Sequence, residues 1–196
     1  FRRLAAQFVP EDAAYWTTHG YCVEPPSPYF SYVVPLADCG LADATSPPTL
    51  FGWLVREVVA TARAAPDVFP TVGGVRFAEF WAHNRPHASG HQLHFDSDDE
   101  GRGGVRNPVA TSVFYFSSGV GGPTLITNQR LRPPGLATAG WVCPSVANRL
   151  VVFDATVLHG VVPGKGPLPE AAAASAGKVA SRGDAREALH FGRIDA

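Results

Sequence analysis

The sequence has few cysteines and none of the spacing of a disulfide-rich protein. Its three cysteines, Cys22, Cys39 and Cys143, are odd in number and far apart. They fit neither a disulfide framework nor a CxxC zinc site, since both need cysteines in matched pairs. We therefore expect three reduced, mostly buried thiols. The expected location is intracellular, with the compartment left open.

The sequence also lacks an excess of charge, long apolar runs and methionine. The formal net charge is −1, so nothing predicts attraction to nucleic acid or to an anionic membrane surface. No apolar run is long enough to span a bilayer, and no secretory signal is present at the start. The chain begins at Phe1 and contains no methionine at all. We expect a domain excised from a longer protein, so the missing targeting signals say little about location.

What is present is enough apolar sequence for one globular domain. Of the 196 residues, 45% are hydrophobic, which predicts a single domain over 1–196 with a real core. We expect that core over about 49–162. A tract rich in Gly, Pro and Ala over about 163–188 is expected to be an insertion or surface loop. The remaining segment, 189–196, is a candidate for the start of the last strand.

The periodicity predicts helices first and strands afterwards. A short helix is expected near Pro10–Gly20, and the proline-rich Glu24–Pro35 is expected to be irregular and mostly extended. The clearest helix runs from about Thr49 to Ala64, because its apolar residues recur every three or four positions. Short β-rich segments then follow and predict a mainly β (α+β) sandwich or barrel: Val75–His83, Gln92–Asp96, Ala110–Ser117, Thr124–Thr127, Gly140–Cys143 and Arg149–Asp154.

Two histidines and one aspartate form the most informative pattern. His94 and Asp96 are two residues apart in an expected strand, where alternate side chains share a face. A second apolar strand begins at Leu150 and runs into His159. Two imidazoles and one carboxylate bind one face of Fe(II) and leave the other positions open. The simpler alternative is a polar strand face and an unrelated histidine.

Further motifs carry a family resemblance. The HxD motif is followed by Gly121-Gly-Pro-Thr124 and then by Leu158-His-Gly-Val-Val-Pro163. In this order the motifs resemble the 2-oxoglutarate/Fe(II)-dependent dioxygenases, most closely the prolyl-4-hydroxylase-like branch, over about Val75–Pro163. The resemblance implies a double-stranded β-helix, or jelly roll, with N-terminal helices packed on one sheet. It also implies that His94, Asp96 and His159 are the iron ligands and the catalytic centre.

The same resemblance implies Fe(II) and 2-oxoglutarate as cofactors, with ascorbate as a further candidate. Tyr115 occupies the place of a tyrosine that often binds 2-oxoglutarate in this family. The family's basic residue usually lies about ten residues beyond the distal histidine, but here that distance falls at Pro169-Glu170. Arg193 is expected to be the displaced basic residue. The alternatives are Lys165, Arg182 and Arg186.

The expected activity is hydroxylation of a C–H bond in a peptidyl proline or a small molecule. The expected partner is therefore a small-molecule cosubstrate, with the primary substrate unassigned and neither nucleic acid nor membrane implicated. One rival is a cupin-like jelly-roll metalloprotein that does not use 2-oxoglutarate. Another is a binding domain with a vestigial site.

Several side chains keep two interpretations open at this stage. Asp154 could support the metal ligands or cap a turn. Tyr115 could contact the cosubstrate or fill the core. Trp53, Trp81 and Trp141 are expected in the core, with an aromatic cage as the lesser alternative.

Overall fold

The computed structural model describes residues 18, 31–39, 50–82, 91–97, 106–119, 122–163 and 188–189. The expected helix near Pro10–Gly20 and the insertion over 163–188 lie almost wholly outside these residues. Within them the chain is mainly β, and no described helix is both long and apolar enough to cross a bilayer. The elements in chain order are β1 (Tyr32–Pro35), η1 (Leu36–Cys39), α3 (Leu50–Arg63), η2 (Val72–Gly74), β2 (Phe77–Phe80), β3 (His91–His94), β4 (Ala110–Tyr115), β5 (Thr124–Arg130), β6 (Gly140–Cys143), β7 (Arg149–Asp154), β8 (Val157–Val161) and β9 (Ala188–Leu189).

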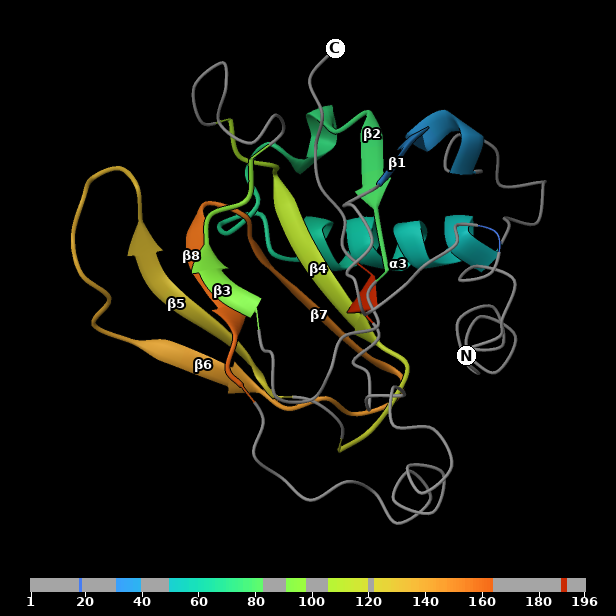
Figure 1. Ribbon diagram of the computed structural model, residues 1–196. Coiled ribbons are helices and arrows are strands. Elements are labelled where there is room, and N and C mark those ends of the chain that lie inside the picture. Colours follow the sequence, from blue (N-terminus) through green and yellow to red (C-terminus); the bar gives the residue numbers. More distant parts are fainter. Residues whose placement is uncertain are drawn as a thin grey trace, which may run out of the picture.

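The strands form antiparallel sheets (Figure 1). One sheet has four strands in the order β3-β8-β5-β6, and another has three in the order β7-β4-β9. A third sheet pairs β1 with β2. Every pairing between these strands is antiparallel. The mainly β prediction is thus confirmed.

Strand β4 has one face toward each of two apolar clusters. Val113 and Tyr115 are buried in a cluster with Phe153 on β7 and Ile126 on β5. Phe114 points to the opposite face, where it joins a cluster that includes residues of α3. This follows from the alternation of side chains along a strand. The inner cluster lies between the two larger sheets, and the outer one lies under the helix.

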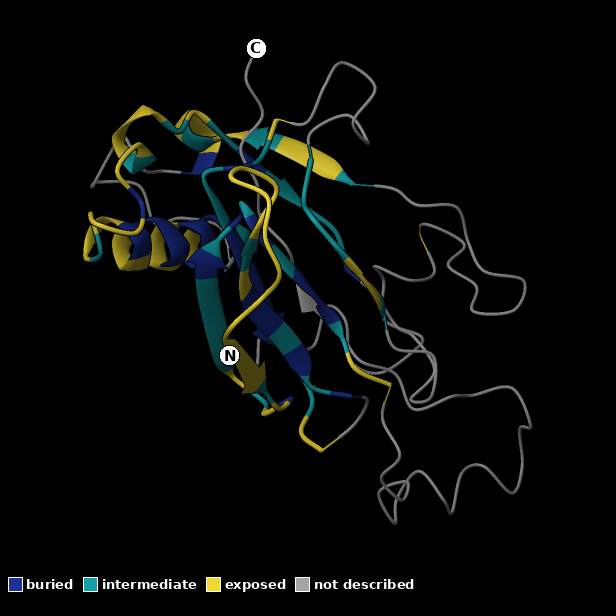
Figure 2. Cartoon of the chain, turned by 90° about the vertical axis from the view of Figure 1, so that its left-hand side faces the viewer, coloured by how far each residue is buried: buried dark blue, intermediate teal, exposed yellow. Residues whose placement is uncertain are grey.

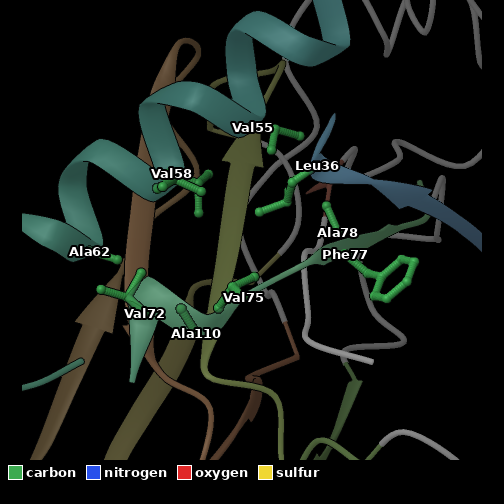
Figure 3. Close-up of a pocket in the computed structure, with 10 residues that line it drawn as sticks. Leu36, Val55, Val58, Ala62, Val72, Val75, Phe77, Ala78 and Ala110 are labelled. Carbon is green, nitrogen blue, oxygen red and sulfur yellow. The ribbon is translucent and has the colours of Figure 1, made fainter. Parts of the chain in front are cut away.

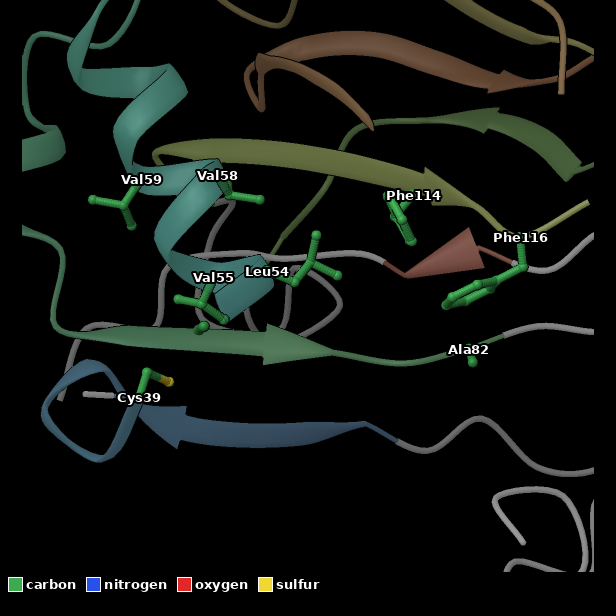
Figure 4. Close-up of a cluster of buried hydrophobic side chains, with 9 residues drawn as sticks. Cys39, Leu54, Val55, Val58, Val59, Ala82, Phe114 and Phe116 are labelled. Atoms are coloured by element: carbon green, nitrogen blue, oxygen red, sulfur yellow. The ribbon is translucent and has the colours of Figure 1, made fainter. Parts of the chain in front are cut away.

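Helix α3 covers the outer face of the three-stranded sheet through one apolar stripe. Leu54, Val55 and Val58 are buried, whereas Trp53 is 43% exposed on the other side of the helix. Figure 2 shows this division along the helix, and Figure 4 shows the stripe facing β4. The expected helix over Thr49–Ala64 is confirmed.

The packing beneath α3 leaves a small apolar cavity. It holds about 30 Å³ and lies between α3, η2 and β2, with Val58 and Ala78 among its walls (Figure 3). A space of this size has room for about one water molecule but offers no polar partner to hold it. Around this cavity, α3 packs on the sheet through the apolar contacts of the outer cluster.

The structure refines or corrects three predictions about the strands. Residues 32–35, in the segment expected to be irregular and mostly extended, form strand β1, because they pair with β2 and Pro35 stands at the strand's end. The apolar run toward His159 is two strands, β7 and β8, in different sheets. Strand β3 ends at His94, so Asp96 lies in the segment that follows it.

Candidate metal centre

Three residues distant in sequence bring their ligand atoms to one place. One ligand atom each from His94, Asp96 and His159 lies within 4.8 Å of the other two. The Oδ1 atom of Asp96 is 3.3 Å from Nε2 of His94 and 3.5 Å from Nε2 of His159. The strand register explains the meeting of the histidines, because His94 on β3 pairs directly with His159 on β8. This group could hold a metal ion.

Both imidazoles present the same nitrogen to this point. Nδ1 of His94 donates to the carbonyl of Gln92 at 2.9 Å, and Nδ1 of His159 donates to the carbonyl of Val157 at 3.0 Å. A carbonyl oxygen can only accept, so each Nδ1 carries the hydrogen. In the neutral ring, Nε2 then has a free lone pair directed toward Asp96. Backbone partners of this kind fix the orientation of metal-binding histidines.

His159 is the most buried of the three. Its side chain is 2% exposed, and its Nε2 atom has no hydrogen-bond partner among the described residues. A buried polar atom without a partner is costly unless something else satisfies it. Burial lowers the pKa of His159, and the charge of Asp96 and the hydrogen bond to Val157 oppose this shift without cancelling it. The lowered pKa favours the neutral imidazole, the form that binds a metal.

The effects on the pKa of His94 balance differently from those on His159. Burial lowers the pKa of His94, but its hydrogen bond to Asp96 and the charge of that carboxylate more than offset this and leave the pKa raised. The ring is also more accessible, with its side chain 27% exposed. In the metal-free protein, protonation of His94 therefore competes with metal binding more strongly than protonation of His159 does.

The second oxygen of Asp96 is held by a residue that the sequence analysis did not single out. Oδ2 accepts a hydrogen bond of 2.5 Å from the hydroxyl of Thr111, which is 1% exposed on β4. Asn107 donates from its side chain to the backbone carbonyl of Asp96 at 2.7 Å. These bonds leave Oδ1 turned toward the two histidines. A threonine on the inner face of a mainly apolar strand was the available signal.

Gly160 lets strand β3 approach β8 closely. A Cβ atom at this position would lie 2.9 Å from the carbonyl oxygens of His91 and Gln92. Such a contact is shorter than real Cβ atoms show, so β3 would have to move. Since β3 carries His94, the glycine beside His159 sets the distance between the two imidazoles.

The predicted cosubstrate contacts are only partly described. Tyr115 is fully buried, and its hydroxyl lies 2.5 Å from the Thr124 hydroxyl within the inner cluster. Tyr115 is therefore a core residue, which was one of its two predicted roles. Its hydroxyl is also hydrogen-bonded to the Thr124 hydroxyl. Arg193 lies outside the described residues, as do its alternatives Lys165, Arg182 and Arg186.

Other open questions are answered by direct contacts. Asp154 caps the turn after β7, because its Oδ1 accepts from the backbone N–H of Thr156 at 2.9 Å. Its Oδ2 pairs with Arg130 at 2.5 Å. The prediction that the tryptophans are core residues is wrong for Trp53 and Trp141, which are 43% and 57% exposed. Trp53 lies off the apolar stripe of α3, and Trp141 lies on β6, the last strand of its sheet.

Comparisons with known proteins find likeness in structure only. No protein-family model matches the chain, and no curated protein matches it in sequence. A prolyl-4-hydroxylase from Pseudomonas putida aligns with a TM-score of 0.43 and 18% identity, covering 91% of this chain and 86% of that one. AviO1 from Streptomyces viridochromogenes Tue57 aligns with a TM-score of 0.45 and 17% identity, covering 99% and 80%. Since both TM-scores are below 0.5, the functional proposal depends on the site itself.

Proposed function

We propose that the protein is a non-haem Fe(II), 2-oxoglutarate-dependent dioxygenase that hydroxylates a C–H bond. The observation that carries this proposal is the convergence of His94, Asp96 and His159, with both Nε2 atoms aimed at one carboxylate oxygen. Two histidines and one carboxylate suit Fe(II), because three protein ligands on one side leave positions open on the other. The Nε2 atom of His159 is buried and has no hydrogen-bond partner among the described residues, which is consistent with a role as a metal ligand.

The strand pairing supports a jelly roll as the fold that holds this site. The pairs β5 with β6, β4 with β7, and β3 with β8 are nested inside one another along the chain. Each pair encloses the next one along the sequence, as the antiparallel pairs along a single long hairpin do. Successive pairs alternate between the two larger sheets, as they do when such a hairpin is wound into a jelly roll.

Iron and 2-oxoglutarate together would supply the oxidising chemistry, with O₂ and the substrate C–H converted to an alcohol as 2-oxoglutarate becomes succinate and CO₂. The chain would hold and orient the reactants. His94, Asp96 and His159 would bind the metal, and Thr111 would keep Asp96 Oδ1 facing it. The buried inner cluster would keep water from the inner side of the site.

The far carboxylate of 2-oxoglutarate needs donors of its own. The adjacent hydroxyls of Tyr115 and Thr124 are candidates, because each can donate to a carboxylate. We keep Arg193 as the proposed charged partner, since a guanidinium binds a carboxylate with two parallel hydrogen bonds. Arg186 is the alternative to test beside it.

Succinate formation from 2-oxoglutarate under air tests this function. We expect turnover that requires Fe(II), that is lost in Asp96→Ala, and that falls sharply in one of Arg193→Ala and Arg186→Ala. Whichever variant raises the KM for 2-oxoglutarate identifies the charged partner. Stoichiometric iron binding without succinate formation would overturn the proposal and favour a cupin-like metalloprotein. The primary substrate, a peptide or a small molecule, would then be sought by its acceleration of this turnover.

A further inference from the structure

A large cavity lies beside the candidate metal centre, where the two main sheets open. Its volume is about 550 Å³, within the range of small-molecule sites. Strand β6 ends the four-stranded sheet and β7 ends the three-stranded sheet, and the cavity lies between these edges. The lining consists of Val68, Ile126, Thr127, Asn128, Arg130, Trp141, Cys143, Val151, Val152, Phe153, Asp154 and Val157.

Two residues of this lining also border the metal centre. The ring of Phe153 packs edge-on against the His159 ring, with centroids 4.9 Å apart. Ile126 lies directly opposite His159 in the pairing of β5 with β8. One layer of side chains therefore separates the cavity from a metal ligand. A molecule held in the cavity would lie behind Phe153 and Ile126, on the side of the centre that His159 occupies.

Most polar side chains of the lining are already bonded to the protein. The Thr127 hydroxyl donates to the Leu158 carbonyl at 2.7 Å. The Asn128 amide donates to the Thr138 hydroxyl at 2.8 Å and accepts from two backbone N–H groups at 3.0 Å. A ligand would thus find few unsatisfied hydrogen-bonding groups here.

The charges of the lining also cancel. Arg130 and Asp154 form an ion pair at 2.5 Å, and the Arg130 guanidinium also donates to Thr156. No other ionic side chain belongs to the described lining. The cavity therefore offers no net charge to attract an anionic or cationic ligand.

Trp141, the largest apolar side chain of the cavity lining, is exposed. Trp141 on β6 is 57% exposed although it contributes to the cavity wall. A tryptophan buries a large area when a ring or a branched chain packs against it. The remaining wall is made mainly of valine, isoleucine and phenylalanine. The cavity is suited to an uncharged, apolar molecule that covers the indole.

We infer that this cavity binds the uncharged, apolar body of the primary substrate, with Trp141 as its main contact and Phe153 at the end nearest the metal centre. The inference rests on the proposed function for what happens to the substrate. Binding of the apolar molecule does not depend on the proposed function, because it needs neither metal nor 2-oxoglutarate. The two can therefore fail separately.

Binding is tested on the metal-free full chain with N-phenyl-1-naphthylamine, an uncharged probe that fluoresces in apolar surroundings. We expect saturable binding, weakened about tenfold in Trp141→Ala, because one aromatic contact is removed. Trp53→Ala removes another exposed tryptophan, on α3 and outside the cavity lining, and should leave the affinity unchanged. Equal affinity in wild type and both variants would overturn the inference, as would preference for the anionic 8-anilinonaphthalene-1-sulfonate.

A second measurement does not depend on a tryptophan variant. Cys143 is a free thiol in the cavity lining, whereas Cys39 is buried elsewhere. We expect bound probe to slow alkylation of Cys143 by N-ethylmaleimide, mapped by peptide mass spectrometry. Saturating probe that leaves this rate unchanged would place the binding site elsewhere.

Turnover then links the cavity to the reaction. Uncharged compounds that displace the probe should accelerate succinate formation, with a KM about tenfold higher in Trp141→Ala and unchanged in Trp53→Ala. If displacers bind while succinate forms at an unaltered rate, the cavity does not hold the substrate, although the proposed function stands. If the probe binds but no succinate forms under any condition, the proposed function fails and the cavity remains a binding site.

Discussion

Replacing Thr111 by valine tests how the carboxylate of the metal centre is oriented. The change keeps the branched shape but removes the hydroxyl that donates to Asp96 Oδ2. Thr111 is 1% exposed, so bulk water cannot readily take its place. A hydrogen bond to a charged group contributes about 1.5–3 kcal/mol. Losing an outer partner of a metal ligand weakens metal binding by about 10–100-fold. We expect a loss of affinity in that range.

The assay is anaerobic titration with Mn(II), a stable stand-in for Fe(II), followed by the electron paramagnetic resonance signal of the free ion. Ser112→Ala is the matched control. Ser112 is the next residue on β4, fully buried, with a hydroxyl that has no partner among the described residues. It points to the opposite face of the strand, so its loss should leave Mn(II) affinity unchanged. Wild-type affinity in Thr111→Val, or an equal loss in Ser112→Ala, would refute the reasoning.

Three further predictions test the approach of the strands, the protonation of the site and the packing of the helix. Gly160→Ala should force β3 away from β8 and weaken Mn(II) binding at least about tenfold, whereas Gly73→Ala, which meets no atom within 4 Å, should not. Burial lowers the pKa of His94, but Asp96 offsets this and leaves the pKa raised, so Mn(II) affinity should fall as pH drops through it. In Asp96→Asn, nuclear magnetic resonance titration of the metal-free protein should show that pKa lowered; an unchanged value would exclude Asp96 as its cause. Leu54→Ala should reduce the free energy of unfolding in urea by about 2–5 kcal/mol, because Leu54 is 1% exposed under the helix; a loss below about 1 kcal/mol would show that the site repacks.

The sequence predicted well those elements that one local pattern determines. Helix α3 has a clear apolar stripe, and its bounds agree with the expected Thr49–Ala64 to within a residue. Strands β6 and β7 also begin and end where the sequence indicated. In each case a short local pattern of apolar residues between turn-forming residues was enough to define the element.

The candidate site was predictable in its residues but not in its geometry. His94, Asp96 and His159 do come together, although Asp96 lies beyond the end of β3. Its position depends on Thr111, which is on another strand, and on the irregular pairing of β3 with β8. Contacts of this kind are set by tertiary structure, and a single sequence does not indicate them.

Turns inside apolar runs were the other source of error. Asp154 and Thr156 form a tight side-chain-capped turn that separates β7 from β8. An Asp two residues before a Thr is a recognisable turn signal, but the apolar residues on both sides concealed it. Because of this turn, His159 lies in a different sheet from Phe153.

The most direct test of the metal centre is an anaerobic titration with Fe(II), followed by addition of 2-oxoglutarate. We expect one Fe(II) per chain and a visible charge-transfer band when 2-oxoglutarate is added. Both should be absent in Asp96→Ala, because its carboxylate oxygen lies between the two imidazole nitrogens. Iron binding or a band that persists in Asp96→Ala would contradict the assignment of His94, Asp96 and His159 as the site.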